Sequence, residues 1–178
     1  VWDLNTGQPV GPAMSARTNF NGLLNLSLNP AGRLIALPTL PDSATVFDAA
    51  SGKETLKLSA GTPSFTGAFF TPDGARIVTT HTRGDGQIWN AKTGEAIGPP
   101  LYHNDSISSV AFSPDGMLVA TRSADGRVKL WNTHTGEAPG EFAETFNGPV
   151  RDVAFSRDGT LLTAASDDGS VRNWDLTT

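Results

Sequence analysis

The feature that most constrains the fold is an internal repeat of about 42 residues. An aromatic residue followed by Asp or Asn recurs five times, as Trp2-Asp3, Phe47-Asp48, Trp89-Asn90, Trp131-Asn132 and Trp174-Asp175. These aromatic residues are 45, 42, 42 and 43 positions apart and include all four tryptophans of the chain. A fixed period of 20–50 residues is the signature of a repeat architecture. The chain is therefore expected to consist of similar units that stack on one another.

Turn sequences recur with the same period. One series is Asn29-Pro30-Ala31-Gly32, Thr71-Pro72-Asp73-Gly74, Ser113-Pro114-Asp115-Gly116 and Ser156-Arg157-Asp158-Gly159. Proline presets φ, aspartate bonds nearby backbone and glycine accepts positive φ, so these segments predict tight turns. A second series follows the aromatic residues, at Thr6-Gly7, Ser51-Gly52, Thr93-Gly94 and Thr135-Gly136.

Short runs rich in Val, Ile, Leu, Phe and Thr lie between these turns, for example Ile107 to Ser113 and Arg127 to Trp131. Such runs bounded by turn residues are typical of β-strands. Bulky and small residues alternate in Val110-Ala111-Phe112, which is the period of a sheet. Each repeat is therefore predicted to form four antiparallel strands, here named a to d in chain order, with the aromatic-Asx pair closing strand c.

This repeat resembles the WD40 family, whose units have about 40–45 residues, four strands per propeller blade and a Trp-Asp signature. Ser108 to Gly116 and Val128 to Asn132 are similar to the family consensus, and Gly98 to His103 resembles bacterial members. The resemblance covers the whole chain and implies an all-β, WD40-type propeller segment of about four blades. The expected units are a partial blade at 1–14, blades at 15–60, 61–102 and 103–146, and three strands of a last blade at 147–178.

The resemblance also implies a hydrogen-bonded tetrad of His, Ser or Thr, Asp and Trp inside a blade. By position, the repeat that ends at Trp131 supplies all four members: His103, Thr121, Asp125 and Trp131. A neutral imidazole between a carboxylate and a hydroxyl, with that hydroxyl also meeting the indole N–H, would satisfy these buried polar groups.

The other repeats depart from the tetrad, and their blades are expected to depend on packing and turns. The last repeat keeps Asp168 but has Phe146 and Ala164 at the His and hydroxyl positions. The repeat ending at Trp89 has Gly61 and Arg83 in place of His and Asp, and the one before it has Asn19, Pro41 and Phe47.

The number of blades bears on whether they can close into a ring. Propellers have 4–8 blades, and the chain holds about four and lacks an initial Met, which favours a segment of a longer array. Its open blade ends predict self-association. Two chains could close one eight-bladed ring, with Gln8 to Met14 of each chain completing the Pro149 to Asp175 blade of the other. A four-bladed ring closed within one chain is the alternative.

Composition and charge narrow the class of function. The chain is 38% hydrophobic and 17% charged, which is enough apolar residue for a core. It has no cysteine, so disulfides and thiolate chemistry are excluded and a cytoplasmic setting is favoured. A net charge of −5 disfavours nucleic acid as a partner. No apolar run is long enough to cross a membrane.

The sequence carries no catalytic, metal or cofactor motif, so neither an enzyme nor a cofactor is expected. The three histidines, His81, His103 and His134, occupy three different points of the repeat and do not have the spacing of metal ligands. Catalysis within the propeller is therefore the least favoured function.

In the WD40 family, the face that carries the b–c and d–a loops commonly binds proteins. Carried over by position, the candidate partner-binding residues are Thr66, Thr82, Ser106, Ser108, Arg151 and Asp167, with Gly22, Leu24, Leu40, Ser64, Ala124 and Pro149 at the remaining equivalent positions. Arg151 and Asp167 stand out as polar anchors, and the lack of aromatic residues in this set argues against an aromatic cage.

The expected function is a non-enzymatic scaffold for protein–protein interaction. Two alternatives stay open: a recruiting or sensor segment of a larger bacterial signalling enzyme, and an excised or engineered propeller fragment that self-assembles.

Overall fold

The computed structural model describes residues 5–12, 25–39, 42–59, 61, 65–139 and 143–177. Trp2, Asn19, Gly22, Leu24, Leu40, Pro41 and Ser64, which the sequence analysis singled out, lie outside these residues. The described residues form four antiparallel sheets and no helix. The all-β prediction is therefore confirmed.

Each sheet is built from strands that follow one another along the chain. The first contains β1 (Ser27–Leu28), β2 (Leu34–Thr39), β3 (Ser43–Asp48) and β4 (Glu54–Ser59). The second contains β5 (Phe65–Phe70), β6 (Arg76–His81), β7 (Asp85–Asn90) and β8 (Ala96–Tyr102). The third contains β9 (Ile107–Phe112), β10 (Leu118–Ser123), β11 (Arg127–Asn132) and β12 (Ala143–Thr145). The last has three strands, β13 (Val150–Phe155), β14 (Leu161–Ser166) and β15 (Val171–Asp175).

The strands begin and end where the turn chemistry requires. In the third sheet, Gly116 has φ 71° and its N–H donates to the Ser113 carbonyl over 2.8 Å. The Asp115 carboxylate accepts from the Ser113 hydroxyl and from the Met117 N–H. An aromatic-Asx pair closes β3, β7, β11 and β15, as predicted. No strand is found within residues 8–12, where part of an outer strand was expected.

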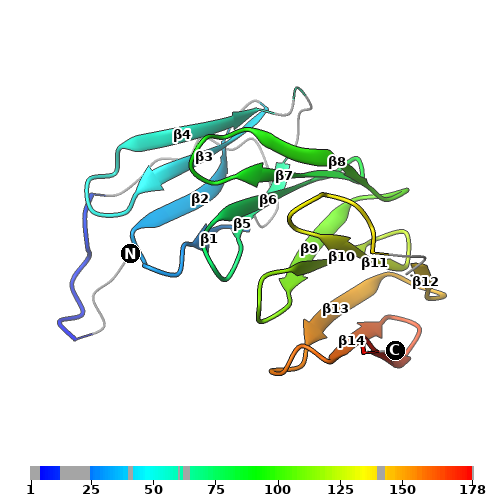
Figure 1. Ribbon diagram of the computed structural model, residues 1–178. Coiled ribbons are helices and arrows are strands. Elements are labelled where there is room, and N and C mark those ends of the chain that lie inside the picture. Colours follow the sequence, from blue (N-terminus) through cyan, green and yellow to red (C-terminus); the bar gives the residue numbers. More distant parts are fainter. Residues whose placement is uncertain are drawn as a thin grey trace.

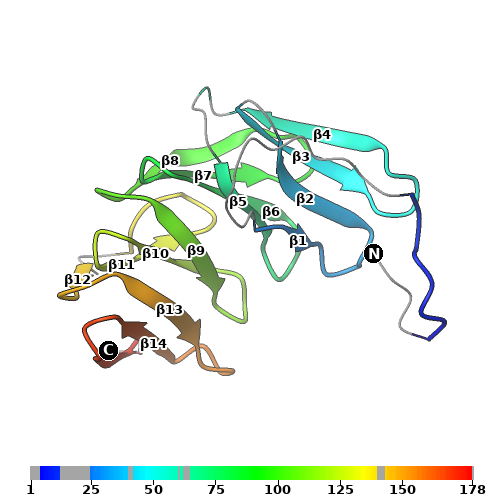
Figure 2. The same ribbon diagram turned by 180° about the vertical axis from the view of Figure 1, so that it is seen from behind.

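The four sheets stack face to face along an arc, as propeller blades do (Figure 1). Apolar side chains fill the space between blades: Ala68 and Phe70 of the second blade pack with Val46 and Leu58 of the first. The first strands of successive blades lie next to one another, and a parallel bridge joins Asn25 to Gly67. The blades at the two ends of the arc do not meet, so the chain forms an open segment rather than a ring (Figure 2).

The a–b turns of successive blades are seated on one another. A Cβ added at Gly74 would lie 3.0 Å from Cδ of Pro30 in the preceding blade. The same relation joins Gly116 to Pro72 and Gly159 to Pro114, at 3.5 and 3.4 Å. In these three turns the glycine therefore leaves room for the proline ring of the preceding blade.

In the first three blades one face of the sheet packs against the following blade, and the equivalent face of the last blade is different. One cross-strand pair at the same register is Ala36–Val46, Val78–Ile88 and Ala120–Leu130 in the first three blades, and all six side chains are buried. In the last blade the pair is Thr163–Asn173, whose side chains hydrogen-bond over 2.7 Å. This face therefore carries a polar pair where the other blades have an apolar one, beside the exposed Leu161 and Val171.

The first blade exposes apolar groups at the opposite end. Leu26 and Leu28 are 59% and 45% exposed, whereas the equivalent Ala68 and Phe70 of the second blade are 0% and 6% exposed. These equivalent positions face the preceding blade, so the first blade presents two leucines where another blade could pack.

Candidate interaction face

The b–c turns and the d–a connections form one face of the arc because the backbone ties them together. The His103 N–H donates to the Gly84 carbonyl and the Phe146 N–H to the Gly126 carbonyl, each over 2.7 Å. We call this surface the interaction face. Its described segments are the turns 82–84, 124–126 and 167–169 and the connections 103–106 and 146–149.

The four tetrad residues of the third blade lie in one chain of hydrogen bonds beneath this face. The Trp131 indole N–H donates to Thr121 Oγ1 over 2.9 Å, and Thr121 Oγ1 lies 2.8 Å from His103 Nε2. His103 Nδ1 lies 3.3 Å from both carboxylate oxygens of Asp125. Because the Asp125 carboxylate can only accept, the proton of the neutral imidazole sits on Nδ1, and Nε2 then accepts from the Thr121 hydroxyl.

Burial keeps His103 neutral. The surrounding protein lowers the pKa of His103 to about 4, because the charged imidazolium would be desolvated, although Asp125 acts in the opposite direction. Burial alone would raise the pKa of Asp125, but N–H groups of Asn104 and Arg127 donate to its carboxylate, and the net shift is downward. At neutral pH the pair is a carboxylate and a neutral imidazole.

Asp125 also fixes the loops of the interaction face, because its two backbone donors come from the d–a connection and the start of β11. Asp168 of the last blade accepts in the same way from the Asn147 N–H, over 2.9 Å. There Phe146 occupies the histidine position and meets Trp174 edge to face, with ring centroids 6.2 Å apart. The last blade thus keeps the loop contact and replaces the polar chain with aromatic packing.

The second blade contains polar contacts that the sequence analysis missed. The Trp89 indole N–H donates to Thr79 Oγ1 over 2.9 Å, as in the tetrad. His81 Nδ1 lies 2.7 Å from Asp85 Oδ2, and Phe65 packs edge-on against the imidazole. The tetrad positions for His and Asp in this repeat hold Gly61 and Arg83, whereas the observed pair joins the end of β6 to the start of β7. A signal was present, since His and Asp four residues apart across a two-strand turn face each other.

Two of the predicted partner-binding residues are engaged in hydrogen bonds that connect blades, one directly and one through an arginine. Thr66 Oγ1 donates to the Ile107 carbonyl over 2.8 Å and also lies 2.7 Å from Thr80 Oγ1. Ser108 Oγ accepts from Arg122, whose guanidinium also donates to the Val150 carbonyl. The Thr66 hydroxyl thus bonds the next blade directly, and the Ser108 hydroxyl holds the arginine that does so, which leaves both less available to a partner.

Thr82 and Ser106 are half-buried, and the Ser106 carbonyl accepts from the Ala124 N–H. Arg151 and Asp167 are exposed, with side-chain exposures of 67% and 41%. Their side chains form a two-pronged ion pair from Arg151 Nε and Nη2 to the two carboxylate oxygens. The structure thus brings the two predicted anchors together as one charged pair on β13 and the last b–c turn.

Among the described residues, no group of three or more His, Cys, Asp or Glu side chains could hold a metal ion. The part of the chain that the structure describes has no helix long and apolar enough to span a membrane.

Comparison with known proteins gives two kinds of match. The family model for "WD domain, G-beta repeat" matches residues 101–132 and 140–175. Among solved structures, the chain resembles the computationally designed Ika4 protein with a TM-score of 0.77 and 19% identity, over 96% of this chain and 99% of that one. It resembles the computationally designed Ika8 protein with a TM-score of 0.80 and 20% identity, over 98% of this chain and 51% of that one. No curated protein matches the sequence.

At these identities the structural likeness is one of fold, and the chain spans about half the length of Ika8. The family match rests on the repeats that contain the tetrad and the last blade, and the same sheet topology extends through the two earlier blades. Residues 101–132 and 140–175 therefore match the WD40 repeat, and the described residues form an open, propeller-like segment.

Proposed function

We propose that this chain is a non-enzymatic scaffold that presents its interaction face to a protein partner. The observation that carries the proposal is the Arg151–Asp167 pair, two exposed charges held toward each other on that face. Stacked blades keep loops in fixed relation, so recognition depends on what the loops display. Paired charges on a rim contribute more to partner choice and association rate than to affinity.

The test is a comparison of partner sets in the native host for the chain in its natural sequence context. We expect Arg151→Glu to lose partners that the unaltered protein captures by cross-linking, and Arg151→Glu with Asp167→Arg to recover some of them. Arg157→Glu is the matched control, because Arg157 is exposed on an a–b turn outside the interaction face. Identical partner sets for Arg151→Glu and the unaltered protein would refute the assignment of this face.

A second candidate function is self-association through the open blade ends. Exposed Leu26 and Leu28 at one end, and a fourth-strand position beside β15 that no described residue occupies, support it. An eight-bladed ring of two chains and an excised or engineered fragment that self-assembles both fit this candidate. Light scattering at micromolar concentration tests it: we expect a dimer that Leu26→Asp with Leu28→Asp dissociates, and a strictly monomeric mass for the unaltered chain would exclude it.

We further propose a cytoplasmic setting, in which the segment either acts alone or recruits partners for a larger bacterial signalling enzyme. The lack of cysteine supports the compartment. A fluorescent fusion tests the compartment, and the coding sequence on either side of the segment tests the link to an enzyme.

A further inference from the structure

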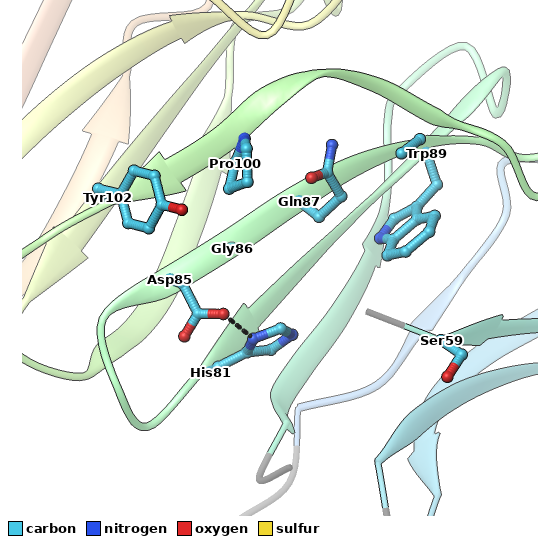
Figure 3. Close-up of a pocket in the computed structure, with 9 residues that line it drawn as sticks. Ser59, His81, Asp85, Gly86, Gln87, Trp89, Pro100 and Tyr102 are labelled. Atoms are coloured by element: carbon cyan, nitrogen blue, oxygen red, sulfur yellow. Dashed lines mark hydrogen bonds and ion pairs between the residues drawn. The ribbon is translucent and has the colours of Figure 1, made fainter. Parts of the chain in front are cut away.

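A pocket of about 370 Å³ lies on the second blade, where His81 and Asp85 flank the turn 82–84 of the interaction face. Its lining comes from β7, β8, the end of β6 and Ser59 of the first blade (Figure 3). The wall is defined by His81, Asp85, Gln87, Trp89 and Tyr102, with smaller contributions from Gly86, Ala96 and Pro100. The pocket thus combines a carboxylate, an amide and two aromatic rings.

Hydrogen bonds within the blade orient the polar groups of this wall. His81 is buried and lies 2.7 Å from one oxygen of Asp85, whose side chain remains 20% exposed. The buried Gln87 amide nitrogen donates to the carbonyls of Ile88 and Ile97, both over 3.1 Å. That orientation leaves Gln87 Oε1 as an acceptor, and it has no hydrogen-bond partner among the described residues.

The aromatic groups complete the wall. Tyr102 is 59% exposed, and its hydroxyl points from β8 across the pocket toward β7 (Figure 3). Trp89 is held by its bond to Thr79, so its ring cannot swing into the pocket without losing that bond. The two rings come from neighbouring strands and lie on either side of the amide.

The chemistry of this lining selects the ligand. No Lys or Arg is present among the nine lining residues, and Asp85 supplies a negative charge. Carboxylate and amide oxygens accept hydrogen bonds, and aromatic faces attract cations. A planar guanidinium offers five N–H donors and also stacks on aromatic rings, which a compact ammonium does less well.

We propose that this pocket binds a guanidinium group, as carried by an arginine side chain. The inference goes beyond the proposed scaffold function and does not depend on the interaction face. The carboxylate of Asp85 meets the charge, Gln87 Oε1 accepts one N–H, and Tyr102 provides a stacking surface. His81 acts as a positioning residue, because it holds the Asp85 carboxylate at the edge of the pocket.

The single tyrosine of the chain provides a direct probe. With 3-fluorotyrosine incorporated, one ¹⁹F resonance reports on Tyr102. Titration with N-acetyl-arginine amide is expected to shift this resonance saturably, with a Kd on the order of 1 mM for so small a ligand. N-acetyl-citrulline amide has the same shape without the charge and is expected to bind at least about tenfold more weakly. Free arginine serves as a further arm, and tighter binding of the free amino acid would point to a metabolite rather than a peptide source.

Two variants test the assignment. Asp85→Asn is expected to weaken binding by about tenfold or more, because it removes the charge. Glu95→Gln removes an exposed carboxylate of the same blade outside the pocket and is expected to leave binding unchanged. Ala96→Arg places a guanidinium at the rim and is expected to abolish binding, and its exposed position keeps this test valid if Asp85→Asn does not fold.

The proposal is overturned if no saturable shift appears up to about 50 mM, well above the expected Kd. It is also overturned if citrulline binds as well as arginine, or if folded Ala96→Arg binds like the unaltered protein.

Discussion

Removal of the Thr121 hydroxyl should destabilise the chain more than removal of the equivalent hydroxyl in the second blade. Thr121 is fully buried and bridges the Trp131 indole and the His103 imidazole. Thr121→Val keeps the shape but leaves both of these groups without their partner. Thr79 bonds a single ring, that of Trp89, so Thr79→Val leaves only one.

The expected loss in free energy of unfolding follows from the number of buried polar groups that lose their hydrogen-bond partner. A buried polar group left unsatisfied costs about 1–3 kcal/mol, so Thr121→Val should lower the free energy of unfolding by roughly 2–6 kcal/mol and Thr79→Val by about half of that. At about 2–4 °C per kcal/mol for a chain of this size, the two melting temperatures should differ by roughly 2–12 °C. Thermal and urea unfolding followed by tryptophan fluorescence measure this difference. Equal losses for the two variants would refute the reasoning that a four-member chain of hydrogen bonds supports the third blade.

Three further outcomes can be checked on the same protein. The pKa of His103 is about 4 in the folded chain and its ordinary value is 6.5, so the unfolded chain takes up the proton first as the pH falls. The contribution of His103 to the free energy of unfolding is therefore full above pH 6.5 and falls by about 3 kcal/mol toward pH 4. Urea unfolding should show a shallower dependence of this free energy on pH for His103→Phe. Gly98→Ala should be far more destabilising in thermal melts than Gly32→Ala, since both glycines have positive φ but only the Cβ at Gly98 would collide with the Thr135 carbonyl, and similar melts would contradict this. Thr163→Val with Asn173→Leu should strengthen association through the last blade, because it converts a polar pair to the apolar pair of the other blades. Sedimentation velocity should then show a larger concentration-dependent rise in mass than for the unaltered chain, and an unchanged profile would contradict this.

The repeat pattern made the fold predictable because each blade is specified locally. Turn chemistry at Pro114 to Gly116 and the closing Trp131 fix both ends of the inner strands, and the strands between them can pair only as neighbours. The tetrad could be located for the same reason, since its members come from one repeat at fixed offsets. No comparable local pattern identifies the partner. The sequence therefore predicts which face of the propeller segment binds a protein, but not which protein binds there.

What the sequence did not predict depends on contacts between repeats. The His81–Asp85 pair departs from the template, and the pocket it borders also needs Ser59 from the preceding blade. Likewise, the side chain of Thr66 matched a binding position but bonds the next blade, and that of Ser108 holds Arg122, which bonds the last blade. Positional transfer identifies where a residue lies within its own unit, whereas these roles are set by the unit beside it.

The seating of each a–b turn on the proline of its neighbour has a consequence for where such a chain can change in length. From turn glycine to closing aromatic residue the spacing is 15 residues in every repeat, at Gly32, Gly74, Gly116 and Gly159. From each aromatic residue to the next turn glycine it is 30, 27, 27 and 28 residues. The differences in length thus fall in the half of the repeat that runs from the closing aromatic residue through the outer strand to the next a–b turn. New recognition loops grafted into this protein belong in that half of the repeat.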